Sequence, residues 1–425
     1  MAKVSQRRNI YVYAGWQGLD GVVLMGSLYA EQSRGNEIFS FEYDKAWIES
    51  GNAQVLDPDL QLYAGKQYIK GAKGNFGMFL DSSPDRWGRL LMRRREAALA
   101  RQEEREQVNL FETDFLLGVY DAHRMGGLRF KLDREGPYLN DNKALASPPW
   151  TSIPELEQIS LKLEEDNVSE DPEYIKWLSM LVAPGSSLGG ARPKASVTDK
   201  NGNLWIAKFP SRYDDSDIGG WEMVTHELAM AAGIVVPGAM AKKFSRNNHT
   251  FLTKRFDRTD DGKRLHFASA MTMLGHTDGE HSAEGVSYLE LVGFITRHGS
   301  KVNEDLEQLW RRIVFNICVS NTDDHLRNHG FLLDKDGWTL SPAYDMNPVE
   351  TGTGLKLNIN EYENDLDLDL AMGVHAYFRL DGERAAKIIE EVKAAVRNWK
   401  AVAAKYRISK KEQELKSGAF RHAGS

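Results

Sequence analysis

The spacing of hydrophobic and polar positions changes along the chain and predicts where strands and helices lie. Runs rich in β-branched and aromatic residues at 22–29 and 38–41 predict strands near the amino terminus. From Pro84 onward, apolar positions recur every three or four residues, which is typical of helices. The clearest helical stripe covers 306–318, and another runs over 388–403. We therefore expect a β-rich beginning and a mainly helical end.

A stretch poor in periodicity suggests where domains meet. Residues 136–154 are rich in Pro, Ser and Asn and show no regular apolar spacing. A chain of 425 residues has room for two or three domains. We predict an amino-terminal β-rich and helical domain at 1–150, a small mixed lobe at 151–265 and a helical lobe at 266–425.

A glycine-rich segment at 184–194 precedes a predicted β-hairpin. Its glycines allow backbone NH groups to approach a phosphate closely, although most such segments are ordinary turns. Two short strands follow, joined by the turn at 199–203. If the strands pair across this turn, Lys194 lies opposite Lys208. Lys208 interrupts an apolar strand, so it is either a guard of a sheet edge or a phosphate ligand.

Two later positions extend this region. Glu222 is expected to open the next helix, where it either orients Lys208 or acts as a favourable acid in the first helical turn. A strand is predicted at 251–256. Phe256 at its end suits either an adenine ring or core packing.

The segment 321–345 combines a helix end, a loop rich in carboxylates and a hairpin. The sequence Asp334-Lys-Asp-Gly337 is a strong turn signal between two short apolar runs. If Leu333 pairs with Trp338, the second strand runs back antiparallel to the first. Asp345 then lies at the same end of the hairpin as Asp323 and Asn328. A base, an amide and a carboxylate are the groups that phosphoryl transfer with Mg²⁺ requires, but a capped helix followed by a surface hairpin fits the segment equally well.

Composition narrows the class of protein. With 41% hydrophobic and 27% charged residues, the chain is ordinary for a folded protein, and no apolar run is long enough for a predicted membrane span. Cys318 is the only cysteine and lies on the stripe at 306–318, which predicts a buried hydrophobe and excludes disulfides. The sequence shows no signal peptide. We therefore expect a cytoplasmic protein that is not bound to a membrane.

The net charge of −7 excludes a basic field over the whole protein, but basic residues cluster locally. The run from Arg86 to Arg105 could bind nucleic acid. The alternative is a solvated helix face, which interleaved glutamates favour. The histidines show no recognisable metal spacing, and we assign His276 and His281 no role.

Taken in order, these motifs resemble those of the HipA family of bacterial serine/threonine kinases, the toxins of toxin–antitoxin pairs. The His-Arg-Asp and Asp-Phe-Gly motifs of typical eukaryotic kinases are missing. The resemblance covers most of the chain and rests on these segments: Leu80-Asp-Ser-Ser-Pro-Asp-Arg-Trp-Gly88, Ser187-Leu-Gly-Gly-Ala-Arg-Pro-Lys194, Lys208-Phe-Pro210, Lys254-Arg-Phe-Asp-Arg258, Asp323-Asp-His-Leu-Arg-Asn328 and Tyr344-Asp345.

The resemblance implies an α+β, two-lobed protein-kinase-like fold and a toxin that uses ATP and Mg²⁺. Asp323 would accept the substrate proton, and Asn328 and Asp345 would hold Mg²⁺. The residues implied in ATP binding are Ser187, Gly189, Gly190, Ala191, Lys194, Lys208, Arg255, Phe256 and His325. Autophosphorylation of Ser187 would inactivate the kinase, because a phosphate adds negative charge to a loop built for ATP phosphates.

The resemblance also implies partners. They are a HipB-like helix-turn-helix antitoxin, operator DNA bound through it, and a protein substrate such as an aminoacyl-tRNA synthetase or another translation factor. The alternatives are a small-molecule phosphotransferase and a co-repressor scaffold without catalysis.

Three departures from the family leave residue roles open. Asp324 replaces a usual glycine, so either adjacent aspartate could be the base, and we favour Asp323. Ser186 competes with Ser187 as the phosphosite. Arg192-Pro193 replaces a more usual polar–acidic pair.

Overall fold

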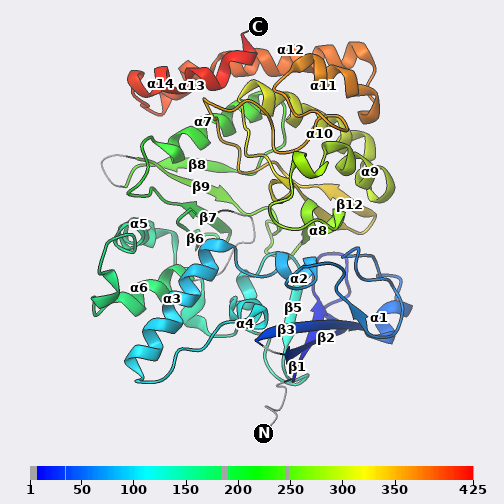
Figure 1. Cartoon of the computed structure of the whole chain (residues 1–425), viewed down its shortest axis with the longest axis vertical. Coiled ribbons are helices and arrows are strands. Elements are labelled where there is room, and N and C mark those ends of the chain that lie inside the picture. Colours follow the sequence, from blue (N-terminus) through cyan, green and yellow to red (C-terminus); the bar gives the residue numbers. More distant parts are fainter. Residues whose placement is uncertain (1–6, 34, 183–189, 191, 245–247, 425) are drawn as a thin grey trace. The chain divides into compact units, whose positions relative to one another are not determined.

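Two units, each mixing strands and helices, make up the structure (Figure 1). The computed structural model describes these residues: 7–33, 35–182, 190, 192–244 and 248–424. Unit 1 contains residues 1–207 and 257–268, and unit 2 contains residues 208–256 and 269–425. Antiparallel strands and helices occur in both, which confirms the predicted α+β class. The predicted limits at 150 and 265 stay predictions.

Unit 1 is built on an antiparallel sheet with strand order β4-β3-β2-β1-β5 (Figure 1). Its strands are β1 (Arg7–Ala14), β2 (Val23–Ser33), β3 (Asn36–Tyr43), β4 (Gln67–Tyr68) and β5 (Leu128–Lys131). On β1, Ile10, Val12 and Ala14 are fully buried, and the residues between them are half-buried. This alternation is the period-two pattern of a sheet with one face on the core, and it confirms the β-rich start.

Helices and a second pair of strands complete unit 1. They are α1 (Lys45–Glu49), α2 (Gly77–Asp81), α3 (Arg86–Gln102), α4 (Glu112–Gly118), α5 (Ile153–Lys162), α6 (Tyr174–Val182), β6 (Lys194–Thr198) and β7 (Leu204–Lys208), whose last residue begins unit 2. Strands β6 and β7 are neighbours in one sheet, and Asp199 N donates to Asn203 O at 3.0 Å in the turn between them. The predicted hairpin is thus present.

The arginines of α3 are engaged within unit 1. Arg89 forms two hydrogen bonds with Glu112, at 2.5 and 2.8 Å. Arg105 pairs with Glu96 at 2.6 Å, and Arg94 donates to the carbonyl of Leu163. Because intramolecular partners take up these cations, the structure favours the helix-face interpretation of this run over a nucleic-acid patch.

Unit 2 is mainly helical. Its elements are α7 (Ile218–Ala231), β8 (Ala239–Lys242), β9 (Thr250–Lys254), α8 (Ala270–Leu274), α9 (Tyr288–His298), α10 (Val302–Cys318), β11 (Gly330–Asp334), β12 (Gly337–Leu340), α11 (Leu368–Val374), α12 (Gly382–Arg397), α13 (Trp399–Lys405) and α14 (Lys410–Lys416). Strand β10 (His266–Ser269) crosses the third junction between the units, where residue 268 meets residue 269. Short 3₁₀ helices include η1 (Asp121–His123), η5 (Ser282–Glu284), η6 (Leu326–Asn328) and η7 (His375–Phe378).

Helix α10 forms the core of unit 2, with α12 packed against it (Figure 1). Its predicted stripe is fully buried, including Leu306, Leu309, Ile313 and Ile317. Cys318 is also fully buried, and burial raises the pKa of its thiol to about 12. The helix and the inert cysteine are therefore confirmed.

Helix α7 begins at Ile218, one turn earlier than predicted, so Glu222 lies in its second turn. The side chain of Asp217 caps the helix by accepting from Gly220 N at 3.1 Å, and it also pairs with His249 at 2.5 Å. A Cβ at Gly219 would lie 2.1 Å from the carbonyl oxygen of His249. Glycine at this position is therefore required for the close approach of the two segments, although glycine pairs disfavour helices in a sequence.

The hairpin β11–β12 has the predicted register. Leu333 pairs with Trp338, and Asp334 pairs with Gly337 across the turn. The stripe at 388–403, expected as one helix, is instead divided at Asn398 into α12 and α13. The change of direction stacks Trp399 on Phe420, with ring centroids 4.4 Å apart, so tertiary packing outweighs the continuous helical pattern.

Candidate functional site

Lys208 is held by two carboxylates within unit 2. Its Nζ lies 2.5 Å from Oε1 of Glu222 on α7 and 2.6 Å from Oδ1 of Asp345, which follows β12. Burial alone would lower the pKa of Lys208, but the charges of Asp345 and Glu222 outweigh it and raise the pKa above its ordinary value. Lys208 is therefore a fixed cation at neutral pH, and the predicted contact with Glu222 is present.

The backbone at Asp345 has an unusual conformation. Its φ is +59°, a left-handed value that costs a non-glycine residue about 1–2 kcal/mol. The preceding Tyr344 is fixed on both sides: its hydroxyl donates to Arg327 O at 2.7 Å, and its ring lies 5.4 Å from that of Phe256. These contacts and the pair with Lys208 hold the carboxylate in place.

The two adjacent aspartates have different environments. Asp323 is exposed, and its carboxylate makes no hydrogen bond or ion pair with any described residue. Asp324 is buried, and its Oδ2 accepts from Tyr288 (2.5 Å), Asn316 (2.9 Å) and His329 (2.7 Å). The carboxylate of Asp323 is free to meet a substrate, whereas that of Asp324 is occupied, which supports the choice of Asp323 as base.

The protonation state of Asp324 follows from these contacts. Burial alone would raise the pKa of Asp324, but its interactions with His329 and the hydrogen bond from Tyr288 outweigh burial and lower the pKa below the ordinary value. The group is therefore a carboxylate at neutral pH. It is a buried anion at the centre of a polar network.

This network reaches both chemical loops. Asn316, bonded to Asp324, accepts from Asn321 Nδ2 at 3.0 Å, and Asn321 Oδ1 accepts from the backbone NH of Asn347 at 3.2 Å. Asn347 lies two residues beyond Asp345. A chain of hydrogen bonds thus joins the loop of Asp323 to the loop of Asp345. Its members are spread along the chain from Tyr288 to Asn347, and only the Asp-Asp-His spacing could have signalled it in the sequence.

Asn328 has the environment expected of a metal ligand. It is buried, and its Nδ2 donates to the carbonyl of Asp323 at 3.1 Å. Its Oδ1 is also buried but has no hydrogen-bond partner among the described residues, and buried oxygens are rarely left unpaired. A Mg²⁺ ion prefers such oxygen ligands and takes few of them from protein. The unpaired oxygen of Asn328 therefore fits the ion, whereas Asp345, whose carboxylate pairs with Lys208, stays a predicted ligand. The described residues include no group of three or more His, Cys, Asp or Glu placed to hold a metal.

The predicted phosphate loop is only partly described. Ser186, Ser187, Gly189 and Ala191 lie outside the described residues. Gly190 has a φ of +94°, a conformation that suits glycine.

Lys194, beside that loop, is engaged within unit 1. It is buried and ion-paired with Asp85 at 2.7 Å, while its Nζ also lies 3.2 Å from Gly190 O. Trp87 Nε1 donates to the carbonyl of Lys194 at 3.0 Å. These contacts tie Lys194 to Asp85 and Trp87 of the predicted Ser-Pro-Asp-Arg-Trp motif.

The remaining predicted residues lie in unit 2. Arg255, just after β9, is buried, and Phe256 is half-buried against Tyr344. His325 is half-buried, and its carbonyl accepts from Asn328 N at 2.8 Å. Nothing in these contacts identifies a ligand, so their roles in ATP binding stay predictions.

His276, to which the sequence assigned no role, is clamped between two glutamates. Its Nδ1 contacts Glu280 and its Nε2 lies 2.8 Å from Glu290. The hydrogen bonds to these carboxylates raise the pKa of His276. A histidine whose pKa is higher in the folded than in the unfolded protein stabilises the fold at pH values below its unfolded pKa. This contribution is lost as the pH rises through the folded pKa, so the contacts with Glu280 and Glu290 stabilise the fold in mild acid.

We expect His276→Gln to lower the free energy of unfolding by about 0.5–1 kcal/mol near pH 5.5 and by much less near pH 9, since the groups are partly exposed. Urea unfolding at both pH values measures the difference. His281→Gln is the control, because the side chain of His281 is exposed and lies 3.4 Å from Glu284. An equal loss at both pH values would show that charge is not the cause.

No helix among the described residues is long and apolar enough to cross a membrane.

Comparisons with known proteins agree with this arrangement. A protein of Haemophilus influenzae named "Putative kinase" is 27% identical over 184 residues, which are 39% of this chain and 53% of that protein. "Putative kinase Y4mE" of Sinorhizobium fredii is 28% identical over 148 residues, a third of each chain. The chain thus spans about half, or less, of the length of these curated relatives.

A solved structure matches nearly the whole fold. It is the HipA chain in a complex described as the Shewanella oneidensis toxin–antitoxin system of HipA, HipB and operator DNA, with a TM-score of 0.66, 18% identity, and 97% of this chain and 96% of that chain covered. The model of the family described as HipA-like C-terminal domain matches residues 186–399, just over half of the 425 residues. The chain belongs to the HipA family.

Proposed function

We propose that this protein is a Mg²⁺- and ATP-dependent serine/threonine protein kinase that acts as a growth-inhibiting toxin. The observation that carries the proposal is the lysine of β7 held between Glu222 and Asp345, with the exposed carboxylate of Asp323 in the same unit. Phosphoryl transfer depends on fixed charges and a positioned base more than on covalent chemistry. The fixed charge of Lys208 and the exposed carboxylate of Asp323 support this proposal.

Each residue of the proposed machinery has one task. Asp323 accepts the proton of the substrate hydroxyl, Lys208 neutralises phosphate charge, and Asn328 and Asp345 hold Mg²⁺. Bound MgATP supplies the phosphoryl group and the metal charge that offsets its oxygens. Phe256 and Arg255 follow β9 and line the adenine site.

Regulation and partners follow from membership of the family. We propose that phosphorylation of Ser187 or Ser186 inhibits the kinase itself. We also propose a HipB-like helix-turn-helix antitoxin as partner, because the matching solved chain is described in complex with HipB and operator DNA. We propose that the protein substrate is a translation factor such as an aminoacyl-tRNA synthetase. The proposed site of action is the cytoplasm.

A mass-spectrometric assay tests the proposal. Purified protein incubated with ATP and Mg²⁺ is expected to gain phosphate on the peptide that contains Ser186 and Ser187. In Lys208→Met the rate is expected to fall about 10²–10³-fold, as when a charge-stabilising donor is removed from a transition state. Lys242→Met is the matched control, because Lys242 is an exposed lysine on β8.

The outcomes separate the alternatives. Equal labelling of wild type and Lys208→Met would overturn the kinase proposal. Transfer to a small hydroxyl compound without protein labelling would indicate a small-molecule phosphotransferase. Absence of both transfer and ATP binding, with binding of a helix-turn-helix partner retained, would indicate a co-repressor scaffold.

A further inference from the structure

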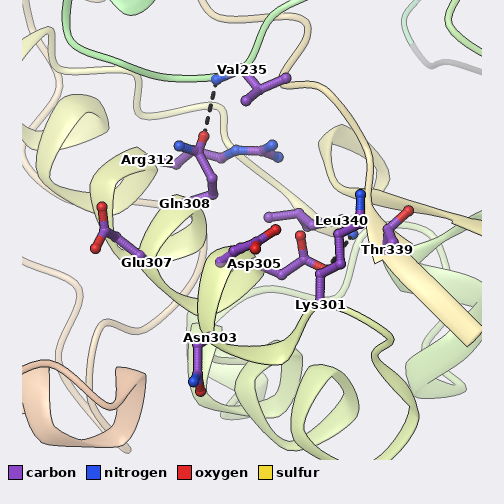
Figure 2. A pocket seen from close by; sticks show the side chains of 10 residues that line it. Val235, Lys301, Asn303, Asp305, Glu307, Gln308, Arg312, Thr339 and Leu340 are labelled. Carbon is purple, nitrogen blue, oxygen red and sulfur yellow. Dashed lines mark hydrogen bonds between the residues drawn. The ribbon is translucent and has the colours of Figure 1, made fainter.

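A cavity of about 550 Å³ opens beside α10 in unit 2 (Figure 2). It is lined by α10 from Asn303 to Arg312 with Lys301 just before the helix, by strand β12 and by Val235, which follows α7. Its volume lies in the range of small-molecule sites, roughly 300–1,000 Å³. None of the residues assigned above to phosphoryl transfer lines it, so it is separate from the proposed kinase site.

Hydrogen bonds from α10 fix each wall of this cavity. Gln308 accepts from Val235 N at 3.0 Å and donates to Gly233 O at 3.0 Å (Figure 2). Asp305 accepts from Leu340 N at 2.9 Å, and Arg312 donates to Ser341 O at 2.5 Å. A site with walls held in this way is formed before any ligand arrives, which reduces the entropy lost on binding.

Arg312 gives the cavity an unsatisfied donor. The side chain is 3% exposed and lines the cavity, and its Nε and Nη1 have no hydrogen-bond partner among the described residues. Burial lowers the pKa of Arg312 to about 10, so the group is still charged at neutral pH. Buried guanidinium donors normally have acceptors. The charges of Asp324 and Asp305 already face Arg312, but neither carboxylate accepts from Nε or Nη1, so a carboxylate of a ligand would supply the missing acceptor.

Asp305 lies on the same side of α10, two turns before Arg312. It is buried, and only one of its oxygens accepts a hydrogen bond from a described residue. Exposed Glu304 lies beside it at the rim, with exposed Lys301 one turn earlier. An anionic ligand alone would be repelled by these carboxylates, whereas a ligand with a separate ammonium group satisfies Asp305.

Two of the lining residues are apolar, whereas Asn303, Glu307 and Thr339 are polar or charged. Val235 is 54% exposed at the edge of the cavity, and Leu340 is half-buried beside Asp305. From the donor, the acceptor and these two side chains, we propose that the cavity binds a small zwitterion with an apolar body, the chemistry of a free apolar amino acid or dipeptide. Arg312 takes its carboxylate, Asp305 its ammonium group, and Val235 and Leu340 its hydrocarbon part.

Binding can be measured on the full chain without any kinase assay. L-leucine and L-leucyl-L-leucine serve as probes in saturation-transfer NMR. We expect 4-methylpentanoate, which lacks the ammonium group of leucine, and 3-methylbutylamine, which lacks its carboxylate, each to bind at least about tenfold more weakly, the usual loss for one charged hydrogen bond. N-acetyl-leucyl-leucine amide carries neither terminal charge and represents a segment inside a protein.

Two variants locate the site. Asp305→Asn keeps an oxygen for Leu340 N and is expected to weaken leucine binding at least about tenfold, whereas binding of 4-methylpentanoate should become stronger because a carboxylate that repels it is removed. Val235→Ser is expected to weaken every probe with an apolar body. Val108→Ser is the matched control, since Val108 is 55% exposed and lies outside the cavity lining.

Leucine or leucyl-leucine binding that Asp305→Asn weakens supports the proposal. Equal binding of 4-methylpentanoate and leucine, or equal binding of leucine to wild type and Asp305→Asn, would overturn the zwitterion. Tighter binding of the blocked dipeptide would assign the cavity to a protein partner instead, and absence of binding by all probes would remove the site. Circular dichroism of each variant establishes that it is folded.

Discussion

Replacing Asp323 with alanine is expected to reduce phosphoryl transfer by about 10²–10⁴-fold, the usual loss when a general base is removed. The free energy of unfolding is expected to change by less than about 0.5 kcal/mol, because the carboxylate is exposed and bonded to no described residue. Phosphate incorporation over time and urea unfolding measure the two quantities. This combination of lost activity and intact stability identifies a residue that acts on the substrate.

The matched control is Asp336→Ala. Asp336 is exposed in the turn of the β11–β12 hairpin and belongs to the same unit, but nothing places it in the site. Its replacement is expected to leave the rate unchanged. If Asp323→Ala retained the wild-type rate, Asp323 could not be the base, whatever the behaviour of its neighbour.

The sequence predicted the parts of the site that depend on short-range rules. The hairpin of β11 and β12 has the expected register because Asp334 and Gly337 specify the turn between two short apolar runs. The contact between Lys208 and Glu222 was one of the two interpretations that the sequence left open for Glu222, and the structure shows it. The stripe of α10 was visible because a buried helix repeats its apolar positions over several turns.

The parts that the sequence did not predict depend on contacts between distant segments. The start of α7 was missed because Gly219 is unfavourable in a helix taken alone, and only its approach to His249 explains it. The interruption at Asn398 arises because Trp399 stacks on Phe420. In both places a tertiary contact decides against the local preference.

The distinction between Asp323 and Asp324 also required three dimensions. Two adjacent aspartates are chemically equal in a sequence, and the resemblance to the family offered no aspartate at the second position. Burial and the hydrogen bonds from Tyr288, Asn316 and His329 separate them. The residue that departs from the family is a buried anion inside the fold, beside the residue that we propose as the base.

Asp324→Ala is expected to destabilise unit 2 by about 3–5 kcal/mol, since the change leaves three buried donors without their shared acceptor. Urea unfolding followed by tryptophan fluorescence measures the loss. Tyr288→Phe removes one of these donors and keeps the carboxylate, so it is expected to cost only about 1–2 kcal/mol. A loss in Asp324→Ala no larger than that in Tyr288→Phe would contradict a central role for the carboxylate.

The pH dependence supplies a second test of the same network. A group with a folded pKa below its unfolded value stabilises the fold above the unfolded value, and this contribution is lost as pH falls through the folded value. For Asp324 the loss should therefore begin below about pH 4, the ordinary value of an aspartate. The gap in unfolding free energy between wild type and Asp324→Asn should be constant from neutral pH down to this point and should narrow below it.

Because Asn316 and Asn321 connect this anion to the backbone of Asn347, the loop of Asp345 should become more accessible to hydrogen exchange in Asp324→Asn under native conditions. Unchanged exchange at Asn347 would mean that the two loops are held independently.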